Sequence, residues 1–68
     1  MDQRFCKNLK SLRRGAAVTQ KQVASYLNVV ESCYANWEQG RTEPNLAMLR
    51  KLATLFEVSL DDLINGDL

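Results

Sequence analysis

The chain has 68 residues, of which 46% are hydrophobic and 25% are charged. This length allows one small domain with a single core, residues 1–68, and the ordinary composition excludes a disordered or collagen-like protein. Residues 1–14 carry five basic residues and one acidic residue, a net charge of +4, whereas residues 42–68 carry two basic and five acidic residues, a net charge of −3. A polyanionic partner would therefore meet the first half, although blocks of like charge also simply keep small domains in solution.

No apolar run reaches the roughly 18 residues of a membrane-spanning helix, and the first residues lack the apolar core of a secretory signal, which predicts a cytoplasmic protein. The chain has no histidine, and neither Cys6 nor Cys33 has a second cysteine at ligand spacing. This pattern predicts no metal site and no cofactor, and it excludes histidine-based catalysis. Two cysteines allow a disulfide by count, but we expect both to be reduced in the cytoplasm.

Apolar residues at helical spacing predict a first helix over residues 3–14. Phe5, Leu9 and Leu12 fall at positions i, i+4 and i+7, so they share one stripe and basic residues occupy the rest of the helix. We expect Gly15 to end this helix with a positive φ.

A second helix is predicted to begin after a short connector. Thr19 and Gln22 have the spacing of a capping box, in which each side chain satisfies a backbone donor of the first turn. The apolar face of this helix consists of Val23, Ala24 and Leu27. We expect Asn28 to end the helix, because asparagine tolerates the left-handed backbone conformation.

A third helix is predicted over residues 30–39, only about three residues after the second. Tyr34 and Trp37 would point inward, and Gly40 would end the helix. Two short helices joined by such a turn form the unit that places one helix in the major groove of DNA. Ala24 supplies the small residue that the crossing of the two helices requires.

Two further helices complete the predicted chain. Pro44 and the cap residue Asn45 precede a fourth helix over residues 46–56. Its wide apolar face consists of Leu46, Leu49, Leu52, Ala53 and Phe56, with Met48 and Leu55 at the edge. Ser59 caps a short fifth helix that ends at Asn65 and Gly66. No segment alternates with a period of two residues, so the predicted fold class is all-α, with five helices and no strand.

The chain resembles the lambda repressor and Cro-like, or xenobiotic-response-element-like, helix-turn-helix family over nearly all of its length. The residues that carry the resemblance are 9–13, 18–24, 36–41 with Pro44, and 58–64. Three positions depart from the family pattern. Asn28 replaces the usual turn glycine, Val30 replaces the usual Ser or Thr cap at a cost of about 1 kcal/mol, and Tyr34 fills a position usually held by a smaller aliphatic residue.

The resemblance implies a compact five-helix fold and two groups of DNA contacts. The residues facing the bases would be Val30, Glu31, Ser32, Ala35 and Asn36. The residues approaching phosphates would be Gln20, Cys33, Gln39 and Arg41. The chemistry of these residues agrees with that division, because Asn36 can bond adenine and Gln20 stands at the N-terminus of a helix. Glu31 has two interpretations: it accepts a hydrogen bond from cytosine, or it only caps its own helix.

The resemblance also implies that Arg13 and Glu38 pair and tie the first helix to the third. A half-buried glutamate without a partner is costly, which favours a structural ion pair over a DNA contact for Arg13.

Two other functional classes compete with DNA binding. An enzyme is disfavoured, because Asp61 and Asp62 diverge around a helix and no base accompanies a cysteine or serine. The serious alternative is a protein-binding helical module, such as an antitoxin or adaptor that covers its partner with the acidic half of the chain. A steep decrease of DNA affinity with salt distinguishes DNA binding from this alternative.

The sequence therefore predicts a small transcriptional regulator that binds double-stranded DNA sequence-specifically, a repressor of bacterial or phage origin associated with the nucleoid. Because one monomer reads about half a site, we expect a homodimer on a palindromic operator. The predicted dimer interface consists of Leu55, Leu60, Ile64 and Leu68.

Overall fold

The computed structural model describes residues 3–68, and these residues form five α-helices and no strand. The helices are α1 (Gln3–Gly15), α2 (Gln20–Leu27), α3 (Glu31–Gln39), α4 (Leu46–Leu55) and α5 (Leu60–Asn65). The predicted all-α fold class with five helices is therefore confirmed. Among residues 3–68 no helix is long and apolar enough to cross a membrane.

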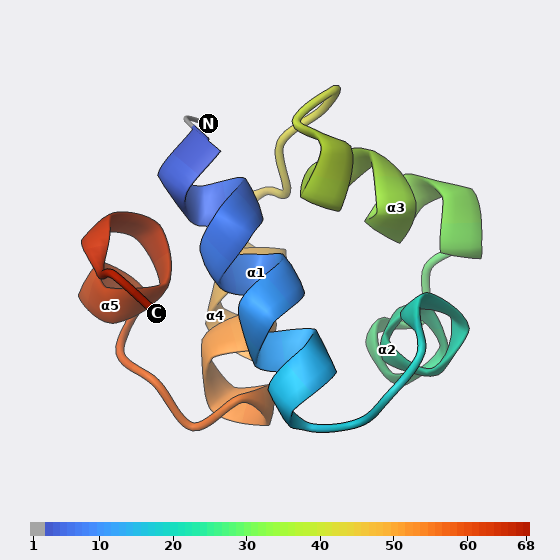
Figure 1. The fold of residues 1–68 in the computed structure, drawn as a ribbon. Helices are drawn as coiled ribbons and strands as arrows, with labels where there is room; N and C mark the ends of the chain where they lie inside the picture. The colour runs from blue at the N-terminus through green and yellow to red at the C-terminus, as the bar shows by residue number, and fades with distance from the viewer. Residues whose placement is uncertain (1–2) are drawn as a thin grey trace.

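Helix α1 occupies the middle of the fold, and Figure 1 shows it in front of α4. The pair α2 and α3 lies on one side of α1, and α5 lies on the other (Figure 1). Helix α1 contacts both α3 and α5, whereas α4 contacts α2 and α5. The helix-turn-helix pair is thus attached to the rest of the molecule through α1 and α4.

All five helices contribute side chains to the hydrophobic core. The buried apolar residues are Phe5, Leu9, Val23, Ala24, Leu27, Tyr34, Trp37, Leu49, Leu52, Ala53 and Leu63. Tyr34 and Trp37 pack edge to face, with ring centroids 5.9 Å apart and an interplanar angle of 71°. Their predicted inward orientation is therefore confirmed.

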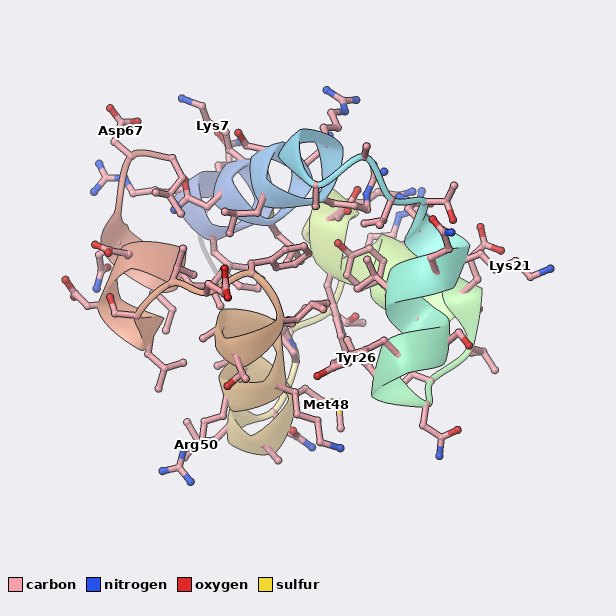
Figure 2. All side chains as sticks on the ribbon, turned by 90° about the horizontal axis from the view of Figure 1, so that it is seen from below. Lys7, Lys21, Tyr26, Met48, Arg50 and Asp67 are labelled. Carbon is pink, nitrogen blue, oxygen red and sulfur yellow. The ribbon has the colours of Figure 1, made fainter. Side chains whose placement is uncertain are left out.

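The prediction that Leu46 belongs to the buried face of α4 is wrong, because this side chain is 56% exposed. At 100° per residue, Leu46 lies about 70° from the centre of the apolar face. It also belongs to the first turn of α4, and Figure 2 shows that the N-terminal end of α4 points away from α1. Phe56, predicted as the last residue of this helix, instead follows it and is half-buried.

Three of the helices begin with the side-chain caps that the sequence predicted. Thr19 accepts a hydrogen bond from Gln22 N while Gln22 Oε1 accepts one from Thr19 N, which completes the capping box of α2. Asn45 and Ser59 accept the equivalent bonds at α4 and α5. Val30 precedes α3 with no side-chain cap, so α3 lacks a contribution of about 1 kcal/mol that Ser or Thr would supply.

Helices α1 to α4 end in the same way, with one residue in the left-handed region followed by a chain reversal. The four left-handed residues are Ala17 (φ 58°), Asn28 (φ 60°), Gly40 (φ 77°) and Glu57 (φ 57°). In each reversal the N–H of the following residue donates to a carbonyl five residues earlier, as from Val18 to Arg13 at 3.3 Å. Asn28 and Gly40 behave as predicted.

The prediction for Gly15 is wrong, because this residue belongs to the last turn of α1 and the left-handed residue is Ala17. Glycine is only the favoured residue at that position. An alanine adopts it at a cost of about 1 kcal/mol when the reversal is otherwise well bonded.

Asn8 of α1 joins the first helix to the C-terminal residues, a role that no local pattern in the sequence indicates. It is completely buried. Its Nδ2 lies within 3.3 Å of the carbonyl oxygens of Asp62, Leu63 and Gly66, and its Oδ1 accepts from Leu68 N at 3.0 Å. Asn8 therefore fixes α5 against α1.

Candidate nucleic-acid interface

The turn between α2 and α3 has the geometry that a helix-turn-helix unit requires. Ala24 of α2 is buried, and Asn28 adopts φ 60° and ψ 42° at the start of the turn. Val29 N then donates to the carbonyl of Ala24 at 3.0 Å. These local bonds fix the angle between α2 and α3 and leave one side of α3 facing solvent.

The five residues predicted to face bases occupy that side of α3 and the position just before it. Val30 is 69% exposed, and Glu31 and Ser32 are also exposed. Ala35 and Asn36 lie one turn further along and are half-buried. Because residues 31, 32, 35 and 36 fall within one sector of an α-helix, the structure places these four predicted residues on one side of α3, with Val30 exposed directly before it.

The four residues predicted to approach phosphates are placed less uniformly. Gln39 and Arg41 are exposed at the C-terminal end of α3. Cys33 is half-buried and packs against the core, so its side chain offers little surface to a ligand. Gln20 lies at the N-terminus of α2, but its amide Nε2 donates to Glu38 Oε1 at 3.0 Å.

A buried hydrogen-bond network fixes α3 to α1 and α2. Glu38 is only 3% exposed, and its carboxylate forms an ion pair with Arg13. Arg13 Nε donates to Oε2 at 2.6 Å and Nη2 donates to Oε1 at 3.3 Å. Arg13 Nη1 also donates to the carbonyl of Val18 at 3.0 Å. The guanidinium therefore bridges α3 to the connector that precedes α2.

Tyr34 and Gln20 complete the coordination of the same carboxylate. Tyr34 Oη donates to Glu38 Oε2 at 2.5 Å, and Gln20 donates to the other oxygen. The carboxylate thus accepts four hydrogen bonds from three side chains. Because Tyr34 replaces the aliphatic residue usual in the resembling family, its hydroxyl adds a donor beyond the predicted ion pair.

The network keeps Glu38 ionised. Burial by itself would raise the pKa of Glu38, but the hydrogen bonds from Arg13, Tyr34 and Gln20 outweigh it and hold this pKa below its usual value. Burial and the adjacent carboxylate raise the pKa of the Tyr34 hydroxyl, so it remains a protonated donor. The hydrogen bond to Glu38 raises the pKa of Arg13. The network therefore combines one ion pair, whose net charge is zero, with one uncharged phenol and one uncharged amide.

Sequence reasoning missed the inward bond of Gln20 and the hydroxyl bond of Tyr34. The signal available for Tyr34 was its position four residues before Glu38 on one helix, a spacing that places two side chains side by side. Nothing local indicated that Gln20 would reach α3. Within the described part of the chain, no group of three or more potential metal ligands lies together.

A family model described as a helix-turn-helix domain matches residues 6–68 of the chain. The HTH-type transcriptional activator BcrR of Enterococcus faecalis is 35% identical over 63 residues, which cover 93% of this chain and 31% of that protein. The HTH-type transcriptional regulator ImmR of Bacillus subtilis is 38% identical over 61 residues, 90% of this chain and 48% of that protein. The SPbeta prophage-derived uncharacterized HTH-type transcriptional regulator YonR of Bacillus subtilis is 34% identical over 62 residues, 91% of this chain and 57% of that protein.

The chain thus spans from about a third to somewhat over half of the length of these curated relatives. No solved structure matched the chain. The matched region includes α2, the turn and α3, together with α4, α5 and most of α1. The chain therefore belongs to the helix-turn-helix domain family.

Proposed function

We propose that this chain is the sequence-specific DNA-binding domain of a transcription regulator and that α3 enters the major groove. The observation that carries the proposal is the solvent-facing side of α3, held in place by the Arg13 to Glu38 pair beneath it. A recognition helix must be rigid to place several side chains against base edges at once. Among the relatives, BcrR is named as a transcriptional activator and ImmR as a transcriptional regulator.

The division of contacts within α3 follows from side-chain chemistry. Val30 can pack on a thymine methyl, Asn36 can bond adenine N6 and N7, and Glu31 can accept from cytosine N4. Ser32 and Ala35 accommodate the bases between these contacts. Gln39 and Arg41, at the end of α3, are proposed to contact phosphates, which position the domain without reading sequence.

Gln20 and Cys33 complete the proposed set of phosphate contacts. Gln20 stands where the free N–H groups of α2 point outward, a favourable site for a phosphate. Because one amide hydrogen of Gln20 serves Glu38, the phosphate would take the second hydrogen and the backbone N–H groups. Cys33 is proposed to approach a phosphate through its position on α3, and its half-buried side chain packs on the core.

A homodimer on a palindromic operator is the proposed functional form. Two recognition helices related by a two-fold axis would enter successive major grooves about 34 Å apart. Of the proposed interface residues, Leu55, Leu60 and Ile64 are partly buried against the core of their own subunit, and Leu68 is 38% exposed. The interface is therefore proposed to use the outer edges of these side chains around α5.

The regulator is proposed to act as a repressor of bacterial or phage origin that is associated with the nucleoid. A compact domain bound at a promoter excludes other proteins from the same DNA, so repression requires no further surface. A reporter gene placed behind a selected site tests the sign of regulation: expression should decrease when the chain is present. An increase would instead indicate activation, the activity that the name of the BcrR protein states for that relative.

Selection of bound sequences from a random duplex pool tests the proposed function. We expect an inverted repeat whose half-sites are separated by about one helical turn. Recovery of a single unrepeated motif would contradict the dimer but not DNA reading. Failure to bind any duplex at low salt would contradict DNA binding itself.

One observation favours a second candidate, a protein-binding module. The acidic residues of the last third of the described chain all lie exposed, namely Glu57, Asp61, Asp62 and Asp67. Such a surface suits a basic protein partner. Chain-specific capture of a basic protein, combined with absence of DNA binding at low salt, would support this alternative.

A further inference from the structure

A broad basic cleft lies between the outer side of α1 and the C-terminal end of α3, outside the set of residues proposed above to read bases. Its volume is about 1010 Å³. One wall carries Lys7, Lys10 and Arg14 of α1, and the other ends in Arg41 beyond α3. Gly40 closes the cleft beside Cys6, since a Cβ at Gly40 would lie 3.3 Å from Cys6 Sγ.

The cleft is strongly electropositive. Its lining includes four cationic side chains and one carboxylate, that of Glu38, which is already paired with Arg13. Within residues 3–68, no ion pair engages Lys10, Arg14 or Arg41. Lys7 lies 3.7 Å from Asp67, but both side chains are exposed, so this contact is weak and easily replaced.

The spacing of these cations suits an extended polyanion better than a single small anion. Lys7, Lys10 and Arg14 fall at positions i, i+3 and i+7, so they form one row along α1. The row is about 10 Å long at 1.5 Å per residue. That length corresponds to about three nucleotides of one DNA strand at 3.4 Å each.

The row also continues from a position where DNA is already expected. Arg41 lines the cleft and directly follows Gly40, the residue that ends α3. A strand that passes Arg41 can therefore turn into the cleft and meet Lys10 and Arg14.

Figure 2 shows Lys7 projecting from α1 on the side of the molecule opposite to Arg50 of α4, so the exposed basic residues are not all gathered on one side.

We propose that this cleft binds the phosphodiester backbone of duplex DNA flanking the part read by α3, with Lys10, Arg14 and Arg41 as phosphate ligands and Lys7 as a weaker one. The inference rests on the proposed DNA-binding function. It extends that function from the helix-turn-helix pair to α1. The consequence is a footprint longer than α3 alone would give.

The test compares two doubly substituted variants of equal charge. Lys10→Gln with Arg14→Gln removes two cleft cations, and Arg50→Gln with Lys51→Gln removes two exposed cations of α4 as a matched control. Binding to a short fluorescein-labelled duplex of arbitrary sequence is measured by anisotropy over a range of salt concentrations. Circular dichroism melts verify that both variants fold.

Each phosphate contact contributes about 0.9 to the slope of log affinity against log salt. We therefore expect the cleft variant to lose about 1.8 from this slope and, near 0.1 M salt, on the order of tenfold affinity per lost contact. The control variant should keep the slope of the parent. A cleft variant that matches the control in slope and affinity would overturn the inference, whereas a parent that binds no duplex would overturn the proposed function instead.

A second measurement reports directly on the cleft. The rate at which iodoacetamide alkylates Cys6 is followed by peptide mass spectrometry, with and without the duplex and with inorganic phosphate at the same ionic strength. The inference predicts that the duplex slows the reaction of Cys6 in the parent and slows it less in the cleft variant. Equal protection by inorganic phosphate would overturn the inference, because it would indicate a site for small anions.

Discussion

Replacing Arg13 by alanine should destabilise the domain strongly, because it removes two of the four hydrogen bonds that the buried Glu38 carboxylate accepts. Hydrogen bonds to charged groups contribute about 1.5–3 kcal/mol each. Breaking a buried ion pair from one side costs about 3–5 kcal/mol. A domain of this size has a free energy of unfolding of roughly 3–10 kcal/mol, so Arg13→Ala is expected to remove about a third of it or more.

The single tryptophan of the chain reports this change. Trp37 is 4% exposed and precedes Glu38, so its fluorescence changes when α3 leaves the core. Urea titration should show Arg13→Ala unfolding at a much lower midpoint, while Arg14→Ala, which changes an exposed arginine of the same helix, should remain within about 0.5 kcal/mol of the parent. Equal midpoints for Arg13→Ala and the parent would refute the structural role of the pair.

The dependence on pH provides an independent check of the same reasoning. The pKa of Glu38 is held below its usual value in the folded parent, so its contribution is present above the unfolded pKa of about 4.3 and is lost as the pH falls through the folded pKa. In Arg13→Ala the carboxylate loses its cation, and protonation then relieves the buried charge. The deficit of the variant should therefore be largest near neutral pH and shrink below about pH 4. A deficit that stays constant with pH would contradict this mechanism.

Four further predictions concern other sites. Asn8→Ala should lower the free energy of unfolding by about 2–3 kcal/mol, because it leaves the buried carbonyl of Leu63 and the carbonyl of Gly66 without this donor. Asn65→Ala, at an exposed asparagine, is the control, and equal urea midpoints would contradict the role of Asn8. Ala17→Gly should raise stability by up to about 1 kcal/mol, since Ala17 has φ 58° and an exposed side chain. A lower melting temperature would show that the left-handed conformation of Ala17 costs less than the extra conformational entropy that glycine loses on folding. Arg41→Ala should weaken binding equally on all duplexes and reduce the salt slope by roughly one, and a changed base preference would show that Arg41 reads sequence. Glu31→Ala should bind non-operator DNA more tightly. Loss of base preference at one symmetric position of each selected half-site would establish that Glu31 reads a base. An unchanged preference would mean that Glu31 only caps its own helix.

The helix boundaries were largely predictable because their signals are local. Thr19 with Gln22, Asn45 and Ser59 each satisfy backbone donors within three residues of themselves, so spacing alone identifies them. The end of α1 was not predictable from Gly15, because the reversal requires a left-handed residue and glycine is only the commonest choice. Leu46 was wrongly predicted to be buried because it lies at the border of the apolar face of α4. The sequence does not show whether another helix covers this border.

The candidate site was predictable as a surface but not as a hydrogen-bond network. The helical period places residues 31, 32, 35 and 36 on one side of α3 without knowledge of the fold. The bond from Gln20 to Glu38 joins residues 18 apart, and the bonds between Asn8 and residues 62–68 join residues 54 to 60 apart. Such pairs depend on how helices pack, so polar residues that hold α1 in place leave no local pattern.

The reversals that end α1 to α4 bear on how the chain folds. Each is closed by hydrogen bonds spanning three to five residues, and in three of the four a valine follows the left-handed residue and packs against the core. The chain can therefore change direction four times without waiting for distant partners, which keeps contact order low and favours folding in microseconds to milliseconds. The entropy of loop closure is then concentrated in the docking of α1 against α3 and α5. We therefore expect the docking of α1, which carries both Arg13 and Asn8, to limit the rate at which α3 becomes fixed.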